Sequence, residues 1–314
     1  MIKYIYSVLN SNNPNVFLLK LLLIITFCYF VHLFWMKSNK KTKYEGFTQE
    51  LPYVLKTNEN IYDSFYAEVY DEIHKPEHRV GYELLNIIDV TQPTTRNSCF
   101  LDVGSGTGKV VDELREAGYR AYGIDKAKAM VNVAEEKYPE SEYQCGDILE
   151  PMAFEKGTFS HILCNYFTIY EISDKITFFR NCQHWLQPNG YLIVHLVNPD
   201  KFDPISPAAK TKLSTNPNKY SDKRITNSIV NFKDFQYKLN YDFRKVKSNV
   251  VEVKEFFIDE NTSNIRENDN TLFIQSIDEI VTTANTNGFL THAKFDMKDC
   301  NDDENQYIYI FEKI

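Results

Sequence analysis

The stretch Ser98–Val111 reads S-C-F-L-D-V-G-S-G-T-G-K-V-V, and the rest of the chain is organised around it. Its apolar run ends abruptly at Gly104, Gly106 and Gly108, and an amphipathic run follows at once. This order predicts a buried parallel strand, a tight glycine turn and a helix whose N-terminus faces a ligand. Glycine permits the bend and lets a ligand approach the main chain closely. The turn by itself does not say which ligand binds.

The composition is that of an ordinary globular protein. The 314 residues are 43% hydrophobic and 25% charged, which suffices for one large domain or two small ones. The net charge of −8 disfavours a nucleic-acid partner, because such proteins usually carry a basic face. The six cysteines form no CxxC pair and no metal-ligand spacing, so we expect reduced thiols, a reducing compartment and no metal site.

The N-terminal segment predicts a membrane anchor. After a tail of residues 1–15, Val16–Met36 is almost uninterrupted apolar sequence. A helix of that length spans about 31 Å, close to the thickness of a bilayer core. The segment lacks both the small-residue cleavage site of a signal peptide and the polar face of an ordinary core helix. Lysines follow it in the linker 37–57, so the positive-inside rule predicts a single-pass protein whose domain, residues 58–314, faces the cytoplasm.

Strand and helix patterns alternate after the glycine turn. The predicted strands are Arg120–Asp125, Tyr143–Asp147, Phe159–Asn165 and Gly190–Val197, with a helix from Ala127 to Tyr138 after the first. This alternation is typical of a doubly wound parallel α/β sheet, which binds ligands at the carboxyl ends of its strands. The polar residues that end successive strands, any one of which could also be a helix cap, are Asp102, Asp125, Asp147 and Asn165.

Three other nucleotide-binding signatures fit less well. The dinucleotide fingerprint needs a glycine where the chain has Lys109, and no G-K-[ST] follows the glycines as a P-loop would require. Ser228, Tyr241 and Lys245 have the spacing of short-chain dehydrogenases, in which the last two share a helix. Here alternation predicts a strand, which would separate positions 241 and 245 by about 13 Å. We interpret this match as coincidence.

The motifs resemble those of the class I S-adenosylmethionine-dependent methyltransferases. The similar stretches are L-D-V-G-S-G-T-G, Y-G-I-D, C-G-D-I and L-Q-P-N-G-Y-L-I-V, within residues 60–200, and the likeness continues more loosely over 276–314. The resemblance implies a Rossmann-like, seven-stranded, mostly parallel sheet and S-adenosylmethionine as cofactor. One departure is Ser160, where relatives usually have Asp after the phenylalanine; this position does not touch the cofactor in the family.

The C-terminal part predicts an insertion and a final hairpin. Alternating apolar runs between Ile229 and about Ile274 suit antiparallel strands, so residues 200–275 are interpreted as an antiparallel β insertion over the active site. A helix over Ile277–Asn287 and strands over Phe289–Met297 and Gln306–Glu312 follow. Family members use such insertions for substrate selection.

The resemblance also implies roles for particular residues. The glycine loop would accommodate the amino-acid end of the cofactor, with Asp102 organising the loop, Asp125 holding the ribose hydroxyls and Asp147 accepting from the adenine amino group. The aromatic helix before the loop would cover the methionine end, although its tyrosine spacing also fits plain packing. The complete set of candidate cofactor residues is Asp102, Gly104, Ser105, Gly106, Gly108, Asp125, Lys126, Asp147, Ile148, Asn165, Tyr62, Tyr70 and Arg79.

The acceptor and the catalytic base are not determined by the sequence. A base is needed only if the acceptor keeps a proton until attack, and the candidates are Tyr170, Glu171 and His195. Glu171 also fits a helix start, and His195 fits the core of a strand. The leading hypothesis is a membrane-anchored methyltransferase that acts on a small molecule, a lipid-proximal compound or a protein side chain. The alternatives are a non-catalytic cofactor-fold module that recruits a partner to a membrane, and a nicotinamide-dependent oxidoreductase.

Overall fold

The computed structural model describes residues 51–210, 217–300 and 302–314, together with positions 20, 22, 25–27, 29, 30 and 49. The chain divides into two compact units, residues 1–48 and 49–314. The predicted tail 1–15 and most of the predicted anchor Val16–Met36 lie outside the described residues. Across the described positions, no helix is both long enough and apolar enough to cross a membrane.

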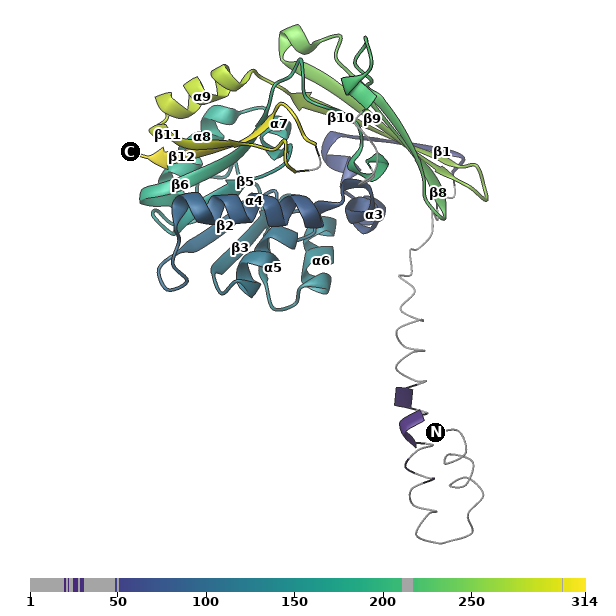
Figure 1. The fold of residues 1–314 in the computed structure, drawn as a ribbon, viewed down its shortest axis with the longest axis horizontal. Coiled ribbons are helices and arrows are strands. Elements are labelled where there is room, and N and C mark those ends of the chain that lie inside the picture. Colours follow the sequence, from purple (N-terminus) through teal and green to yellow (C-terminus); the bar gives the residue numbers. More distant parts are fainter. Residues whose placement is uncertain are drawn as a thin grey trace. The chain divides into compact units, whose positions relative to one another are not determined.

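A seven-stranded sheet forms the centre of residues 49–314 (Figure 1). Its order is β11-β12-β6-β5-β2-β3-β4; β12 runs antiparallel to both neighbours, and the other strand pairs are parallel. This confirms the predicted doubly wound sheet and terminal hairpin. The strands are β2 (Cys99–Val103), β3 (Arg120–Asp125), β4 (Glu142–Cys145), β5 (Phe159–Cys164), β6 (Leu186–Val197), β11 (Phe289–Asp296) and β12 (Gln306–Lys313).

Helices cover both faces of this sheet. In Figure 1, α4, α5 and α6 lie along one side, and α8 and α9 lie along the other. Apolar side chains of α4, such as Leu84 and Ile87, pack against Phe100 of β2 and Ile193 of β6 in one buried core. The helices are α3 (Ser64–His74), α4 (Pro76–Thr91), α5 (Lys109–Glu116), α6 (Lys128–Lys137), α7 (Thr168–Glu171), α8 (Lys175–Trp185) and α9 (Ile277–Thr286).

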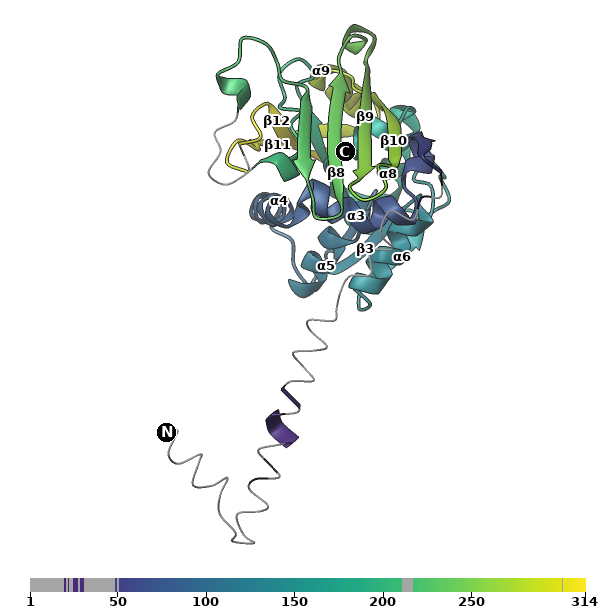
Figure 2. The same cartoon turned by 90° about the vertical axis from the view of Figure 1, so that its right-hand side faces the viewer.

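A second sheet of five strands, ordered β1-β10-β9-β8-β7, comes mainly from the predicted insertion (Figure 2). Neighbours β7 to β10 pair antiparallel, as the alternating runs predict. Inward positions of β9 are buried at every second residue, because successive strand side chains point to opposite faces. The insertion strands are β7 (Asn227–Asn231), β8 (Phe235–Asp242), β9 (Val250–Asp259) and β10 (Ile265–Phe273).

The end of the predicted linker belongs to this second sheet. Residues assigned to the linker 37–57 include β1 (Tyr53–Thr57), which pairs parallel with β10 along the sheet edge. A short 3-10 helix, η1 (Asn58–Ile61), follows. The sequence of β1 is only five residues long, so its own periodicity is weak. Its strand conformation depends on backbone pairing with a partner that lies far away in the sequence.

A partly buried ion pair joins the insertion to the first helix of the domain. Arg266 of β10 donates to both carboxylate oxygens of Asp63 at 2.9 Å and to the carbonyl of Ile61 at 2.9 Å. Asp63 also caps α3 by accepting from the Tyr66 N–H. The predicted aromatic helix before the glycine loop therefore begins after this cap, at Ser64. Through this contact the second sheet and α3 are held together.

Candidate functional site

A large cavity lies between the carboxyl edge of the central sheet and the inner face of the second sheet. Its volume is about 1790 Å³, and its walls come from η1, α3, α7, the glycine loop and strands β8 to β10. Ligand pockets usually measure about 300–1,000 Å³. The cavity therefore has room for two ligands side by side.

The glycine turn forms one wall of this cavity. Gly104 and Gly106 line it and have φ values of +68° and +53°, a conformation that residues with a Cβ rarely adopt. Gly106 faces Tyr70 of α3, whose ring would lie 3.9 Å from an added Cβ. The Thr107 hydroxyl donates to Asp71 of α3 at 2.6 Å. These contacts fix α3 over the loop.

The acids predicted at the ends of β3 and β4 lie next to the glycine turn. Asp125 accepts from the Gly106 N–H and the Ala127 N–H, both at 2.8 Å, one on each carboxylate oxygen. Burial raises the pKa of Asp125, against the opposing effect of these two donors. Each oxygen keeps a lone pair for a further donor.

Asp147 is the more solvent-accessible of the two acids. One oxygen accepts from the Leu149 N–H at 2.9 Å, and the other pairs with the Lys126 ammonium at 3.0 Å. Partial burial raises its pKa, but these two contacts outweigh burial and hold the pKa below its usual value. Lys126 also pairs with Glu59 of η1. The cofactor candidates Lys126, Asp147 and Ile148 all line the cavity.

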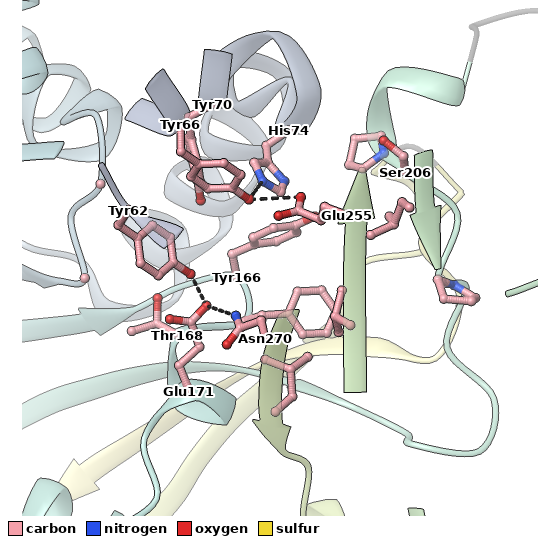
Figure 3. Close-up of a pocket in the computed structure, with 18 of the residues that line it drawn as sticks. Tyr62, Tyr66, Tyr70, His74, Tyr166, Thr168, Glu171, Ser206, Glu255 and Asn270 are labelled. Carbon is pink, nitrogen blue, oxygen red and sulfur yellow. Dashed lines mark hydrogen bonds between the residues drawn. The ribbon is translucent and has the colours of Figure 1, made fainter. Parts of the chain in front are cut away.

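Aromatic rings of α3 and of the segment after β5 line the opposite wall (Figure 3). The Tyr70 and His74 rings lie 4.3 Å apart, and the Tyr166 ring stacks beneath the Arg79 guanidinium at 4.0 Å. Burial, helped by the nearby Arg79 charge, lowers the pKa of His74 to about 3. His74 is therefore a neutral member of this wall at physiological pH.

Glu171 ends α7 and joins the two sides of the cavity. It accepts hydrogen bonds from the Tyr62 hydroxyl and from Nδ2 of Asn270 on β10, the latter at 3.3 Å (Figure 3). Its side chain is exposed to solvent and lines the cavity. Desolvation by neighbouring protein groups disfavours the charged form and raises the pKa of Glu171 to about 7, although the bonds from Tyr62 and Asn270 oppose the rise.

A second carboxylate, Glu255 of β9, is more tightly held. Its Oε1 accepts from the hydroxyls of Tyr66 at 3.0 Å and Tyr237 at 2.7 Å, and its Oε2 accepts from Asn268 at 3.3 Å. The side chain is buried, and burial raises its pKa. Sequence analysis missed Glu255. The sequence pattern that could have identified Glu255 is a carboxylate on the same strand face as the apolar Val251, Val253 and Phe257, which are buried.

Other candidates lie behind the cavity wall. Asp102, Ser105, Gly108 and Asn165 are absent from the lining, although they neighbour residues that form it. Burial raises the pKa of Asp102, and the nearby charges of Glu83 and Asp125 add to the rise. These positions support the loop rather than form its surface.

Tyr170 and His195, two of the three candidate bases, do not reach the cavity. The fully buried Tyr170 hydroxyl accepts from the Val197 N–H at 2.8 Å. The His195 ring bonds the Tyr166 carbonyl and Oε1 of Gln306, and burial, helped by Arg79, lowers its pKa to about 4. Both side chains are occupied by backbone or core partners: Tyr170 points inward from α7, and His195 lies in the buried part of β6. Of the three candidates, Glu171 is the one that lines the cavity.

The residues present fit S-adenosylmethionine. Two glycines give close access to the main chain, and Asp125 and Asp147 offer acceptor oxygens at the adjacent strand ends. Four of the ten buried polar atoms without a hydrogen-bond partner in the described part of the chain belong to candidate cofactor residues: Nε of Arg79, Oγ of Ser105 and both amide atoms of Asn165. Such atoms are uncommon in folded proteins and mark places where a polar ligand or water belongs.

Comparisons with known proteins agree with this geometry. Residues 101–194 match the family model of a methyltransferase domain. A dTDP-4-amino-2,3,4,6-tetradeoxy-D-glucose N,N-dimethyltransferase of Saccharopolyspora spinosa is 28% identical over 46% of this chain and 59% of its own. A ubiquinone biosynthesis O-methyltransferase of Coxiella burnetii is 28% identical over 40% of this chain and 53% of its own. The chain thus spans between half and three-fifths of these relatives.

Solved structures share the fold. The CcbJ methyltransferase from Streptomyces caelestis superimposes with a TM-score of 0.58 at 18% identity, over 81% of this chain and 98% of its own. SAM-bound CalS10, an amino pentose methyltransferase from Micromonospora echinaspora, superimposes with a TM-score of 0.54 at 16% identity, over 75% of this chain and 90% of its own. The predicted resemblance is confirmed to this extent: residues 101–194 match a methyltransferase domain, and the chain shares the fold of solved methyltransferases.

Proposed function

We propose that residues 58–314 transfer a methyl group from S-adenosylmethionine to a small-molecule acceptor. One observation carries the proposal: the glycine loop and the acids of β3 and β4 open into a single cavity that has room for a second ligand. The sulfonium methyl of this cofactor is already activated. The protein's main contribution is then to hold donor and acceptor in line, which supplies much of the acceleration.

The groups that line this part of the cavity offer a contact for each part of the cofactor. Asp125 and Asp147 would accept from the ribose hydroxyls and the adenine amino group, since each carboxylate offers more acceptor positions than its backbone donors occupy. Gly104 and Gly106 would let the amino-acid end approach the main chain. Tyr62, Tyr70 and Arg79 would enclose that end from the side of α3 and α4.

A small molecule is the acceptor that the cavity favours. The second sheet and the segment Asp203–Lys210 enclose the space beyond the cofactor residues. A cavity bounded by these elements suits a compact substrate. The relatives named for an amino sugar and an amino pentose support this class of acceptor.

Titration calorimetry of the full-length chain with S-adenosylhomocysteine tests the proposal. We expect binding, and in Asp125→Asn a loss of affinity of at least about tenfold, because the amide places a donor against one of two backbone N–H groups. Asp89→Asn, on the exposed face of α4, serves as the matched control. A folded chain that does not bind S-adenosylhomocysteine would overturn the assignment.

Membrane attachment is a separate proposal that rests on the sequence of Val16–Met36 and on the lysines that follow it. The domain would face the cytoplasm by the positive-inside rule. Flotation of the full-length chain with liposomes, compared with a chain that lacks residues 1–44, measures attachment. Equal flotation of the two chains would contradict it.

A further inference from the structure

We propose that the methyl acceptor is an aliphatic amine, bound as its ammonium ion among the aromatic rings of the cavity, and that Glu171 receives its proton before methyl transfer. This inference rests on the proposed function and names its substrate class. Three observations support it. They are the wall of aromatic rings formed by Tyr62, Tyr66, Tyr70, His74 and Tyr166 (the ring wall), the charge balance of the cavity lining, and the position of Glu171.

The ring wall matches a cation. Tyr62 and Tyr66 lie 5.5 Å apart edge to face, Tyr66 and Tyr70 lie 5.9 Å apart, and His74 lies 5.6 Å from Tyr166. All five side chains line the cavity, and Figure 3 shows them grouped around one space. Arg79 already covers one face of Tyr166, so the acceptor would meet chiefly Tyr62, Tyr66 and Tyr70, at the boundary with the cofactor that Tyr62 and Tyr70 would also contact. The quadrupole of a tyrosine ring attracts an ammonium ion. A neutral hydroxyl gains no such attraction.

The charge balance of the lining points the same way. Among the described residues the cavity is lined by ten carboxylate side chains but only four lysines or arginines. Arg79 pairs with Glu83, Lys126 with Glu59 and Asp147, and Lys210 with Asp203 and Asp303. The fourth, Lys75, is exposed at the end of α3. A phosphate or carboxylate acceptor would therefore meet mostly like charge.

Glu171 lies where the cofactor side and the insertion meet. One turn before it on α7, Thr168 packs against Gly104 so closely that a Cβ there would lie 2.9 Å from the threonine hydroxyl. On its other side, Asn270 of β10 donates to the carboxylate. The glycine loop thus adjoins the start of α7, and the second sheet contacts the carboxylate at its end.

The two glutamates that line the cavity differ in what they can do. Glu255 also lines the cavity, but its carboxylate already accepts from three side chains. Glu171 accepts from two and stays open to the cavity, and its pKa of about 7 suits a group that gains and loses protons near neutrality. Glu171 is therefore the better proton acceptor.

The chemical step balances. The ammonium R–NH3⁺ gives one proton to the Glu171 carboxylate and becomes R–NH2, whose lone pair forms the new C–N bond. The S–CH3 bond breaks, and its electron pair stays on sulfur, so the sulfonium becomes a neutral thioether. The product leaves as R–NH2⁺–CH3, and Glu171 returns its proton to water.

The test uses choline, whose positive charge does not titrate, and the isosteric alcohol in which a tert-butyl group replaces the trimethylammonium group. Both are titrated into the full-length chain saturated with S-adenosylhomocysteine. Binding of S-adenosylhomocysteine is measured first, so a failure of the proposed function shows as its absence. We expect choline to bind at least about tenfold more tightly than the alcohol. Equal binding, tighter binding of the alcohol, or no binding of either overturns the amine assignment.

The pH dependence tests Glu171 itself. Choline affinity should rise between pH 6 and 8 as the Glu171 carboxylate ionises, since its pKa is about 7. The other groups facing it are Tyr62, Tyr70, Tyr241, Asp125, Glu255 and Cys164, and Lys175 of α8 lies behind α7 with a pKa lowered to about 8 by burial. Glu171→Gln separates its contribution from theirs, because only that carboxylate is removed.

The variant should bind choline with little change across this pH range and should keep its affinity for S-adenosylhomocysteine. Glu136→Gln, on the exposed face of α6, is the matched control and should retain the wild-type pH profile. An unchanged profile in Glu171→Gln overturns the role of Glu171. If that variant does not fold, the choline preference of the wild-type chain still decides the amine assignment.

Discussion

Gly108→Ala gives the sharpest test of why the turn needs glycine. Gly108 has φ of +88°, and a Cβ there would lie 2.7 Å from Cζ of Tyr143 and 2.9 Å from Cβ of Ala134. The left-handed backbone costs a residue with a Cβ about 1–2 kcal/mol. Overpacking adds about 1–3 kcal/mol, because Ala134 is held by the backbone of α6 and cannot move aside cheaply. We therefore expect the free energy of unfolding to fall by about 2–5 kcal/mol.

Gly157→Ala is the matched control for this prediction. Gly157 has φ of +69°, but no heavy atom lies within 4 Å of its added Cβ. It should lose only the backbone part, about 1–2 kcal/mol. Urea unfolding followed by circular dichroism measures both variants. With a slope of about 3 kcal/mol per molar, the two midpoints should differ by about 0.3–1 M. Equal losses in the two variants would refute the packing argument.

Two further predictions concern buried side chains. Tyr170→Phe leaves the Val197 N–H without its acceptor and should lower the free energy of unfolding by about 1–3 kcal/mol. The affinity for S-adenosylhomocysteine, measured by calorimetry, should stay within twofold. A large loss of affinity would show that Tyr170 contributes to the site. Burial lowers the pKa of His161 from 6.5 to about 4, so the unfolded chain binds the proton more readily than the folded chain. The free energy of unfolding should therefore fall by up to about 3 kcal/mol as the pH drops from about 6.5 to 4. His161→Phe, stacked on Phe100 as the imidazole is, should flatten this part of the pH profile of thermal unfolding; a profile as steep as that of the wild type would contradict the assignment.

The strands and turns of the central sheet could be predicted from the sequence because each motif that indicates them is local. The apolar run of β2, the three glycines and the acid that ends β3 lie within thirty residues of one another, and each fixes its own backbone conformation. The family resemblance followed from these motifs, and the family match covers the same region. The insertion strands of the second sheet were also predicted, because a strand with one buried face has apolar residues at every second position.

What tertiary structure alone decided is which side chains share the cavity. Tyr170 and Glu171 are neighbours in one helical turn, yet the first is buried against Val197 and the second lines the cavity, since α7 packs between β6 and β10. Glu255 and Asn270 lie far from the motifs in sequence and reach Tyr66 and Glu171 only when the insertion folds back over α3. Periodicity reports the face a residue occupies on its own element. It carries no information about the partner that face will meet, because that depends on contacts between residues far apart in the chain.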